Sequence, residues 1–192
     1  MKLSRNSVIF ATVLCPICFI SILLSLTGTI VSAHNGFAVD NKGLLYVGKD
    51  SRMDVYNNGQ YVDTIYKESK GYRFTIQDEL LYIAINGRVE VRDLSGNLIE
   101  TLDDSIWPTE QYKLDKQKKE FITDNIRYVA TNKFGFYMIT KYSNGGIPEI
   151  VYHIPVVDYI LNCLIVFTFI SLFLIFVTSN AKRSFTENEK RK

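Results

Sequence analysis

Two long apolar runs without a charged side chain bracket a segment in which short apolar and polar stretches alternate. The first run extends from Val8 to Val31 and the second from Tyr159 to Ala181. As a helix, the first run is roughly 36 Å long, enough to cross a hydrocarbon core of about 30 Å. The pattern predicts transmembrane helices over 8–31, where the helix could also act as a signal anchor, and over 156–179.

The average composition conceals this division of the chain. Its 192 residues are 47% hydrophobic and 22% charged, as in many soluble proteins. However, the segment 34–155 holds 15 of the 22 Lys and Arg residues and 17 of the 20 Asp and Glu residues. This distribution excludes a soluble single-domain protein and predicts a polar central domain, residues 34–155, between two membrane anchors.

Basic residues next to the apolar runs predict the orientation. The nearest ones at the two ends are Lys2, Arg5, Lys182 and Arg183. Because loops rich in Lys and Arg stay on the cytoplasmic side, we expect residues 1–7 and the basic tail 180–192 in the cytoplasm and residues 34–155 outside. The outer segment contains no cysteine, so no disulfide would hold it together, and a two-span protein of a bacterial cell membrane is expected.

A second interpretation of the first apolar run is a cleaved signal peptide. The tripeptide Val31-Ser32-Ala33 matches the small-residue pattern at which signal peptidase cuts. Cleavage after Ala33 would remove residues 1–33 and leave one span. The central domain is exported under both interpretations.

The outer segment repeats itself with a period of 37 to 38 residues. Each repeat has short runs of β-branched and aromatic residues separated by Gly, Asn and Asp turns, which predicts a four-stranded antiparallel meander. Three units are predicted, over 36–71, 72–109 and 110–141, followed by a final strand at 147–154. The runs of the third, weaker unit are 112–115, 120–123, 126–129 and 136–139. The predicted fold class is therefore membrane-anchored all-β.

The first unit has a recognisable motif. Phe37-Ala38-Val39-Asp40 is followed by Gly43, by Leu45-Tyr46-Val47-Gly48 and by an Asn58-Gly59 turn. Over residues 36–140 this pattern resembles the blades of NHL-type and SMP-30-like β-propellers. The resemblance implies three blade-like repeats flanked by two transmembrane α-helices, which is an incomplete propeller because closed rings have about 4 to 8 blades. The domain would then associate with a partner or a second copy, or exist as a small open monomer.

Small and polar residues in the apolar runs predict a contact between the two helices. Ser21, Ser25 and Gly28 recur at near-helical spacing in the first run, and small residues let helix backbones approach closely. Asp158 and Asn162 are four residues apart and share one face of the second helix. We predict that these two faces pack together.

Other residues that could carry chemistry have simpler interpretations. Cys15 and Cys18 have redox-like spacing, but in an apolar helix they are expected to pack as small hydrophobic residues. The two histidines, His34 and His153, could meet near the membrane, although two ligands do not complete a metal site. Acidic residues beside turns are expected to bond backbone amides; they are Asp40, Asp78 and Asp115.

The sequence contains no recognised catalytic, phosphate-binding or metal-binding motif. We therefore predict no enzyme activity, no catalytic residue, no cofactor and no metal, and the slightly acidic outer segment disfavours nucleic acid. The expected function is recognition of a protein partner or ligand outside the membrane, with the lipid bilayer as a second contact. The alternatives are an assembly subunit that completes a larger propeller and, as the resemblance implies, a metal-dependent lactonase-like hydrolase.

Overall fold

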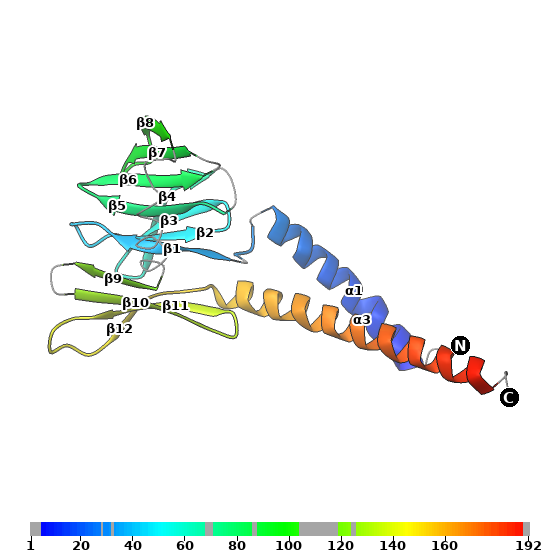
Figure 1. Cartoon of the computed structure of the whole chain (residues 1–192). Coiled ribbons are helices and arrows are strands. Elements are labelled where there is room, and N and C mark those ends of the chain that lie inside the picture. The colour runs from blue at the N-terminus through cyan, green and yellow to red at the C-terminus, as the bar shows by residue number, and fades with distance from the viewer. Residues whose placement is uncertain are drawn as a thin grey trace. The chain divides into compact units, whose positions relative to one another are not determined.

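A computed structural model of the chain describes residues 5–27, 29–31, 33–67, 71–85, 88–103, 119–123 and 126–189. The chain forms two compact units. One consists of residues 1–30 together with 156–192, and the other of residues 31–155 (Figure 1).

The first unit is helical. Helix α1 spans Arg5–Leu26 and helix α3 spans Val156–Glu189, and the two are in contact. The structure thus has helices in both predicted segments, although α1 ends before Val31 and α3 continues past residue 179. Neither helix, over the residues that are described, combines the length and hydropathy of a membrane-crossing segment. The membrane assignment stays a prediction.

The second unit consists of three four-stranded antiparallel sheets, which confirms the predicted repeat architecture at this level. In each sheet the four strands follow one another in chain order. The first sheet comprises β1 (His34–Val39), β2 (Leu45–Lys49), β3 (Arg52–Asn57) and β4 (Gln60–Lys67). The second comprises β5 (Arg73–Gln77), β6 (Leu80–Ile85), β7 (Arg88–Asp93) and β8 (Leu98–Asp103). The third comprises β9 (Glu120–Thr123), β10 (Ile126–Lys133), β11 (Phe136–Tyr142) and β12 (Glu149–His153).

The third sheet is placed one strand later than the predicted unit 110–141. The predicted final strand at 147–154 corresponds to β12, the fourth strand of this sheet, and the predicted first strand at 112–115 lies outside the described residues. The tight turn at Phe134 and Gly135 joins β10 to β11, as predicted, and its φ values of 52° and 86° suit a two-residue hairpin. The displacement arises because β12 pairs with β11 as a fourth strand, so that β9, β10 and β11 are the first three strands.

Turn chemistry in the first sheet follows the prediction. Asn58 and Gly59 have φ values of 47° and 79° in the hairpin between β3 and β4. The Asp40 carboxylate accepts hydrogen bonds from the backbone amides of Lys42 (2.9 Å) and Leu44 (2.8 Å). Asp40 is therefore a turn residue, as expected, and Asp78 also lies in a turn with a φ of 51°. Asp115 lies outside the described residues.

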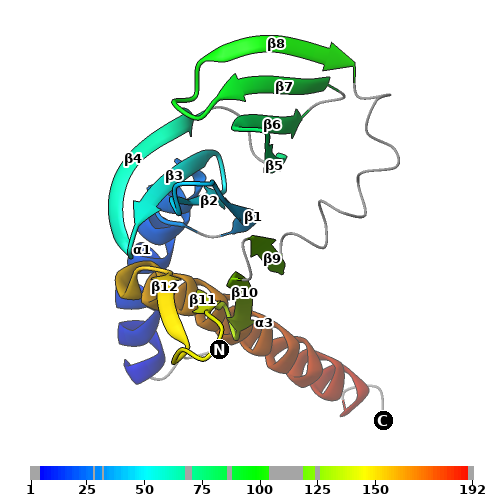
Figure 2. The same ribbon diagram turned by 90° about the vertical axis from the view of Figure 1, so that its left-hand side faces the viewer.

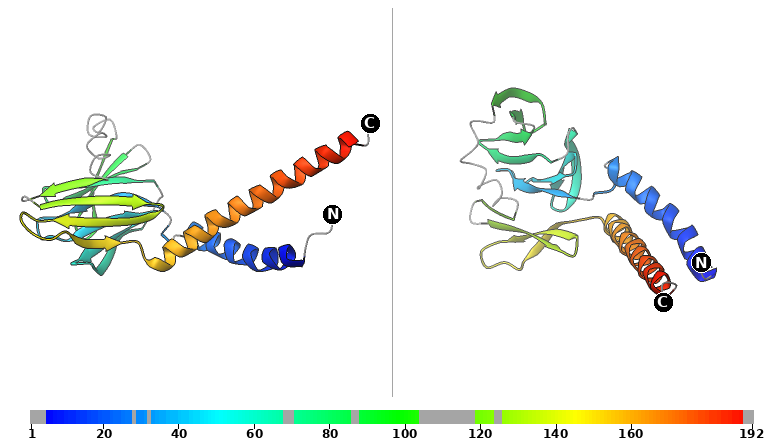
Figure 3. Two further views of the ribbon diagram at one scale, coloured as in Figure 1. Left: turned by 90° about the horizontal axis from the view of Figure 1, so that it is seen from below. Right: turned by 45° about the vertical axis from the view of Figure 1, so that its right-hand side comes forward.

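The first sheet lies between the other two, as Figure 1 and Figure 3 show. Side chains on one face, including Tyr46 and Met53, form a core with Phe74 and Ile83 of the second sheet. Side chains on the opposite face form a separate core with the third sheet; they are Phe37, Val39, Leu45 and Val47, which pack with Tyr128, Tyr137, Ile139, Val151 and Tyr152. Every residue of β2 is consequently buried.

The three sheets lie around a common centre without forming a closed ring from the described strands. Figure 2 shows their first strands innermost and their fourth strands outermost. Strand β1 contacts both β5 and β9. Because the first sheet has a neighbour on each side, the second and third sheets each have one face that none of the described sheets covers.

The close contact between the first and second sheets predicts a strong effect of a small substitution at Gly48. A Cβ atom there would lie 2.7 Å from Phe74 Cε1 and 3.2 Å from the Tyr72 hydroxyl oxygen. Both rings are buried, so we expect Gly48→Ala to lower the free energy of unfolding by about 1 to 3 kcal/mol. Chemical denaturation of the full-length chain measures the change.

Gly146→Ala is the matched control, because its added Cβ would meet Ser143 Cβ at an ordinary 3.4 Å. Equal stability of the Gly48→Ala and Gly146→Ala chains would contradict the tight contact between the two sheets.

Candidate functional site

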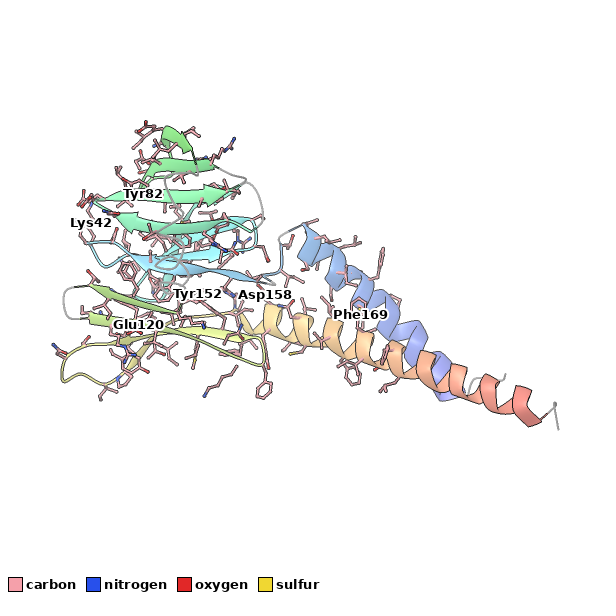
Figure 4. The ribbon with its side chains drawn as sticks, viewed as in Figure 1. Lys42, Tyr82, Glu120, Tyr152, Asp158 and Phe169 are labelled. Carbon is pink, nitrogen blue, oxygen red and sulfur yellow. The ribbon has the colours of Figure 1, made fainter. Side chains whose placement is uncertain are left out.

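A largely buried polar cluster, in which His34 and Tyr56 are half-buried, lies between the first and third sheets. It consists of His34, Lys49, Asp54, Tyr56, Tyr137 and Tyr152. Strand register explains the first-sheet members, because residues paired across an antiparallel ladder point to the same face. Asp54 pairs with Val47 and Tyr56 with Leu45, and both partners belong to the core shared with the third sheet. Tyr152, labelled in Figure 4, enters the cluster from β12.

An ion pair forms the centre of the cluster. Lys49 Nζ lies 2.7 Å from Asp54 Oδ2, and the two side chains are only 3% and 4% exposed. Lys49 also donates a hydrogen bond to the Tyr56 hydroxyl at 2.5 Å. Asp54 Oδ1 accepts one from the Thr64 hydroxyl at 2.6 Å, and Arg52 Nε lies 3.3 Å from Asp54 Oδ2. Both buried charges therefore have several polar partners, as burial requires.

Aromatic rings surround the ammonium group. Lys49 Nζ lies 5.0 Å from the Tyr56 ring centroid and 5.3 Å from that of Tyr152. Both distances are within the range of a cation–π interaction. The two rings meet edge to face with centroids 5.0 Å apart. Lys49 therefore joins the first sheet to β12 of the third sheet through its charge as well as through packing.

His34 completes the cluster from the beginning of β1. Its ring stacks on Tyr137 with centroids 3.9 Å apart, and Nε2 lies 3.0 Å from the Tyr152 hydroxyl oxygen. Burial, assisted by the positive charge of Lys49, lowers the pKa of His34 to about 3. His34 is therefore neutral at physiological pH.

A second buried carboxylate occupies the equivalent position in the second sheet. In the first sheet Lys49 and Arg52 pair at the hairpin between β2 and β3, and Asp54 lies two residues after Arg52. In the second sheet Ile85 and Arg88 pair at the equivalent hairpin, and Glu90 lies two residues after Arg88. Glu90 pairs with Arg88 at 2.7 Å and with Arg92 at 2.8 Å.

Arg92 extends this second site to the first sheet, since its guanidinium lies 5.2 Å from the Tyr66 ring centroid. Burial alone would raise the pKa of Glu90, but hydrogen bonds from Arg92 and Arg88 outweigh it, so this pKa lies below its ordinary value. Both acidic sites thus join neighbouring sheets.

Neither site has the composition of a metal centre. Among the described residues, no group of three or more His, Cys, Asp or Glu side chains could hold a metal ion. The two histidines have different neighbours: His34 stacks on Tyr137, whereas His153 stacks on Phe136 with centroids 6.1 Å apart. Both buried sites are explained by their role in holding neighbouring sheets together.

The residues predicted to join the helices occupy the following positions. Ser21 is buried, and its hydroxyl donates to the Ile17 carbonyl at 2.8 Å. Ser25 in α1 and Asp158 and Asn162 in α3 are half-buried. Gly28 lies outside the described residues. The specific pairing of these faces stays a prediction.

The remaining sequence-predicted residues lie toward the chain ends or inside the helices. Arg5 is the first residue of α1, Lys182 and Arg183 lie in the last part of α3, and Lys2 is outside the described residues. Cys18 is buried and Cys163 exposed. The orientation that the basic residues predict therefore continues to rest on the sequence.

The outer face of the third sheet is the surface that sequence reasoning missed. We use this name for the face of β9–β12 that points away from the first sheet, which the register assigns to Glu120, Ile122, Arg127, Val129, Met138, Thr140, Tyr142 and Ile150. Ile122 is 66% exposed and Ile150 58% exposed. Arg127 Nε and Glu120 Oε1 form an ion pair of 2.7 Å beside Ile122 on β9, whereas Ile150 lies on β12 at the opposite edge of the sheet; Figure 4 labels Glu120. The face therefore presents one exposed aliphatic side chain on each of its two edge strands.

No protein-family model matches the chain, and no curated protein is significantly similar to it in sequence.

The buried ion pair predicts an asymmetric response to mutation. Lys49→Met would leave the Asp54 carboxylate buried without its nearest cation, and we expect a loss of about 3 to 5 kcal/mol in the free energy of unfolding. The double variant Lys49→Met/Asp54→Asn removes both charges and should be more stable than Lys49→Met alone. Chemical denaturation of the purified full-length chain measures both effects.

Arg127→Met is the control for this comparison, because it breaks an ion pair at the surface and should cost no more than about 1 kcal/mol. A double variant less stable than Lys49→Met would show that the pair is not the unit of stabilisation.

The low pKa of His34 predicts that the chain loses stability in mild acid. Below about pH 6.5 the unfolded chain binds a proton at this residue, whereas the folded chain does not until about pH 3. Stability therefore falls as the pH falls, by about 2 kcal/mol at pH 5 relative to neutral pH. Denaturation curves of the native chain and of His34→Gln should diverge by this amount, since the variant lacks the titrating group.

A His34→Gln chain whose stability still falls as steeply between neutral pH and pH 5 would refute the assignment to His34.

Proposed function

We propose that this chain is a non-enzymatic, membrane-anchored interaction module that binds a protein partner outside the cytoplasm through the outer face of the third sheet. The observation that carries the proposal is the exposure of Ile122 and Ile150 on that face. Exposed apolar side chains are costly in water, and covering them with a partner gains free energy.

The packing inside the domain supports this choice of surface. In the first and second sheets, the faces that carry Asp54 and Glu90 are each covered by a neighbouring sheet. Met138 holds the equivalent position on the third sheet, two residues beyond the hairpin pair Lys133 and Phe136, and belongs to the outer face. The same side of the repeat thus serves as a packing surface twice within the chain.

The location outside the cytoplasm is supported by the sequence. Two uncharged runs bracket the domain, and basic residues lie at both outer ends of the chain. A protein with this arrangement would display residues 34–155 outside the cytoplasm. Its task would then be recognition of a partner there.

A second candidate function is assembly, in which a second copy completes a larger β-propeller. The three sheets lie around a common centre and leave the ring open over the described strands (Figure 2). The resemblance of residues 36–140 to propeller blades supports this candidate. Both functions make the outer face of the third sheet an interface, so identifying its occupant separates them.

Site-specific photo-crosslinking in the native membrane tests the proposal. A photoreactive phenylalanine analogue at Ile122 should give one protein adduct, and Ile150→Glu should abolish that adduct by placing a charge in the apolar contact. The same analogue at Ile99 of the second sheet, which is 58% exposed, is the matched control and should give none.

The mass of the adduct identifies the occupant. A different protein, recovered in a fixed ratio to this chain, would support recognition, whereas an adduct of two copies would support assembly. If the analogue at Ile122 gives no adduct, as expected for Ile99, both proposed functions would be contradicted.

A further inference from the structure

The hairpin turn between β10 and β11 contains an unusual residue. Phe134 has a φ of 52° and is 98% exposed. Two-residue hairpins with positive φ favour Asn, Asp or Gly at this position, because a bulky side chain is strained there. Phe134 therefore incurs both conformational strain and the exposure of an aromatic ring, and it belongs to neither core cluster.

The equivalent turns of the other two sheets have ordinary hydrophilic sequences. The first sheet has Asp50 and Ser51 between the paired residues Lys49 and Arg52, and the second has Asn86-Gly87 in its sequence. The hairpin itself therefore does not require an aromatic residue. Phe134 must owe its place to something outside the hairpin.

The position of the turn indicates what that is. Strand β12 runs toward this turn, and the Ile154 amide donates to the Tyr137 carbonyl at 2.8 Å. Tyr137 is three residues from Phe134, roughly 10 Å along a strand. Helix α3 begins at Val156, two residues after Ile154. The exposed ring therefore lies at the end of the sheet from which the chain continues into α3.

Lys133 and His153 give this end of the sheet its polar part. Lys133 directly precedes Phe134 in the turn, and His153 is the last residue of β12 and stacks on Phe136. An aromatic ring next to a long cationic side chain suits the membrane interface, where the ring enters the acyl boundary and the ammonium group stays among phosphates.

We propose that the Phe134 turn inserts into the outer phospholipid interface beside the point where α3 enters the membrane. This inference rests on the proposed membrane location but not on the proposed protein partner. Insertion of the ring would fix the tilt of the β domain above the bilayer by a second contact besides the covalent link to α3.

Fluorescence quenching by brominated lipids tests the insertion. In full-length chains that carry Trp107→Phe, single tryptophans are placed by Phe134→Trp, Ile147→Trp or Phe169→Trp and reconstituted into phosphatidylcholine vesicles. Bromine near the headgroups should quench Phe134→Trp. Its emission should also lie further to the blue, because the inserted ring leaves water. Ile147 is 91% exposed in the loop at the opposite end of the same sheet, so Ile147→Trp should keep its emission.

Phe169→Trp reports on α3 itself and separates the two ways in which the inference can fail. Quenching of Phe169→Trp but not of Phe134→Trp would overturn the insertion and leave the membrane anchor intact. Absence of quenching at both positions would overturn the membrane location as well.

A second measurement avoids the Trp107 substitution. A photoreactive phenylalanine analogue at position 134 of the otherwise native chain should form adducts with phospholipid, and at position 147 it should not. Equal lipid labelling at both positions would also overturn the proposal.

Discussion

Burial of the first sheet on both faces is the constraint on which the β domain depends. A sheet covered on one side only can alternate more and less buried positions along each strand, as β6 does. The first sheet cannot, because each of its faces is covered by another sheet. All five residues of β2 are buried, including Lys49, and the polar residues that remain in its interior must find partners there.

Two carboxylates at equivalent positions of the first and second sheets bind different partners. Asp54 is bound to a lysine from the neighbouring strand of its own sheet and to a threonine hydroxyl, whereas Glu90 lies between two arginines of its own strand. In both cases the cation also faces a tyrosine of an adjacent sheet or strand. Such a site requires one relative position of the sheets, because a shifted sheet would leave buried charges unpaired. The ion pairs therefore specify how the sheets pack, while the apolar cores supply most of the stabilisation.

Local pattern was sufficient to predict the elements but not their assembly. Alternating β-branched and aromatic residues marked the strands, and Asn58-Gly59 and Asp40 marked turns that the structure contains. The third sheet was displaced by one strand because β12, predicted as a separate final strand at 147–154, pairs with β11 and becomes the fourth strand of the sheet. Contacts between sheets are set by pairs distant in sequence, such as Tyr56 with Tyr152, which no local period encodes. Lys49 and Asp54 were missed for the same reason, although a carboxylate in the middle of a strand, repeated as Glu90 after 36 residues, was a usable signal.

The chemistry of the three equivalent faces bears on what covers the third. On the first and second sheets the covered face presents a carboxylate with bound cations to a tyrosine of its neighbour. On the third sheet Met138 takes the place of the carboxylate, and the next equivalent position, held by Tyr56 and Arg92 in the other sheets, is Thr140. A second copy that stacked a sheet on this face in the manner of the internal packing would find no buried charge to pair with. The outer face instead presents exposed Ile122 and Ile150 on its two edge strands and the Arg127–Glu120 pair beside Ile122, which suits a partner surface of mixed apolar and polar character. The outer face of the third sheet thus lacks the buried carboxylate with bound cations that specifies the partners of the internal packing surfaces. This difference favours recognition of a different protein over completion by a further copy of the same chain.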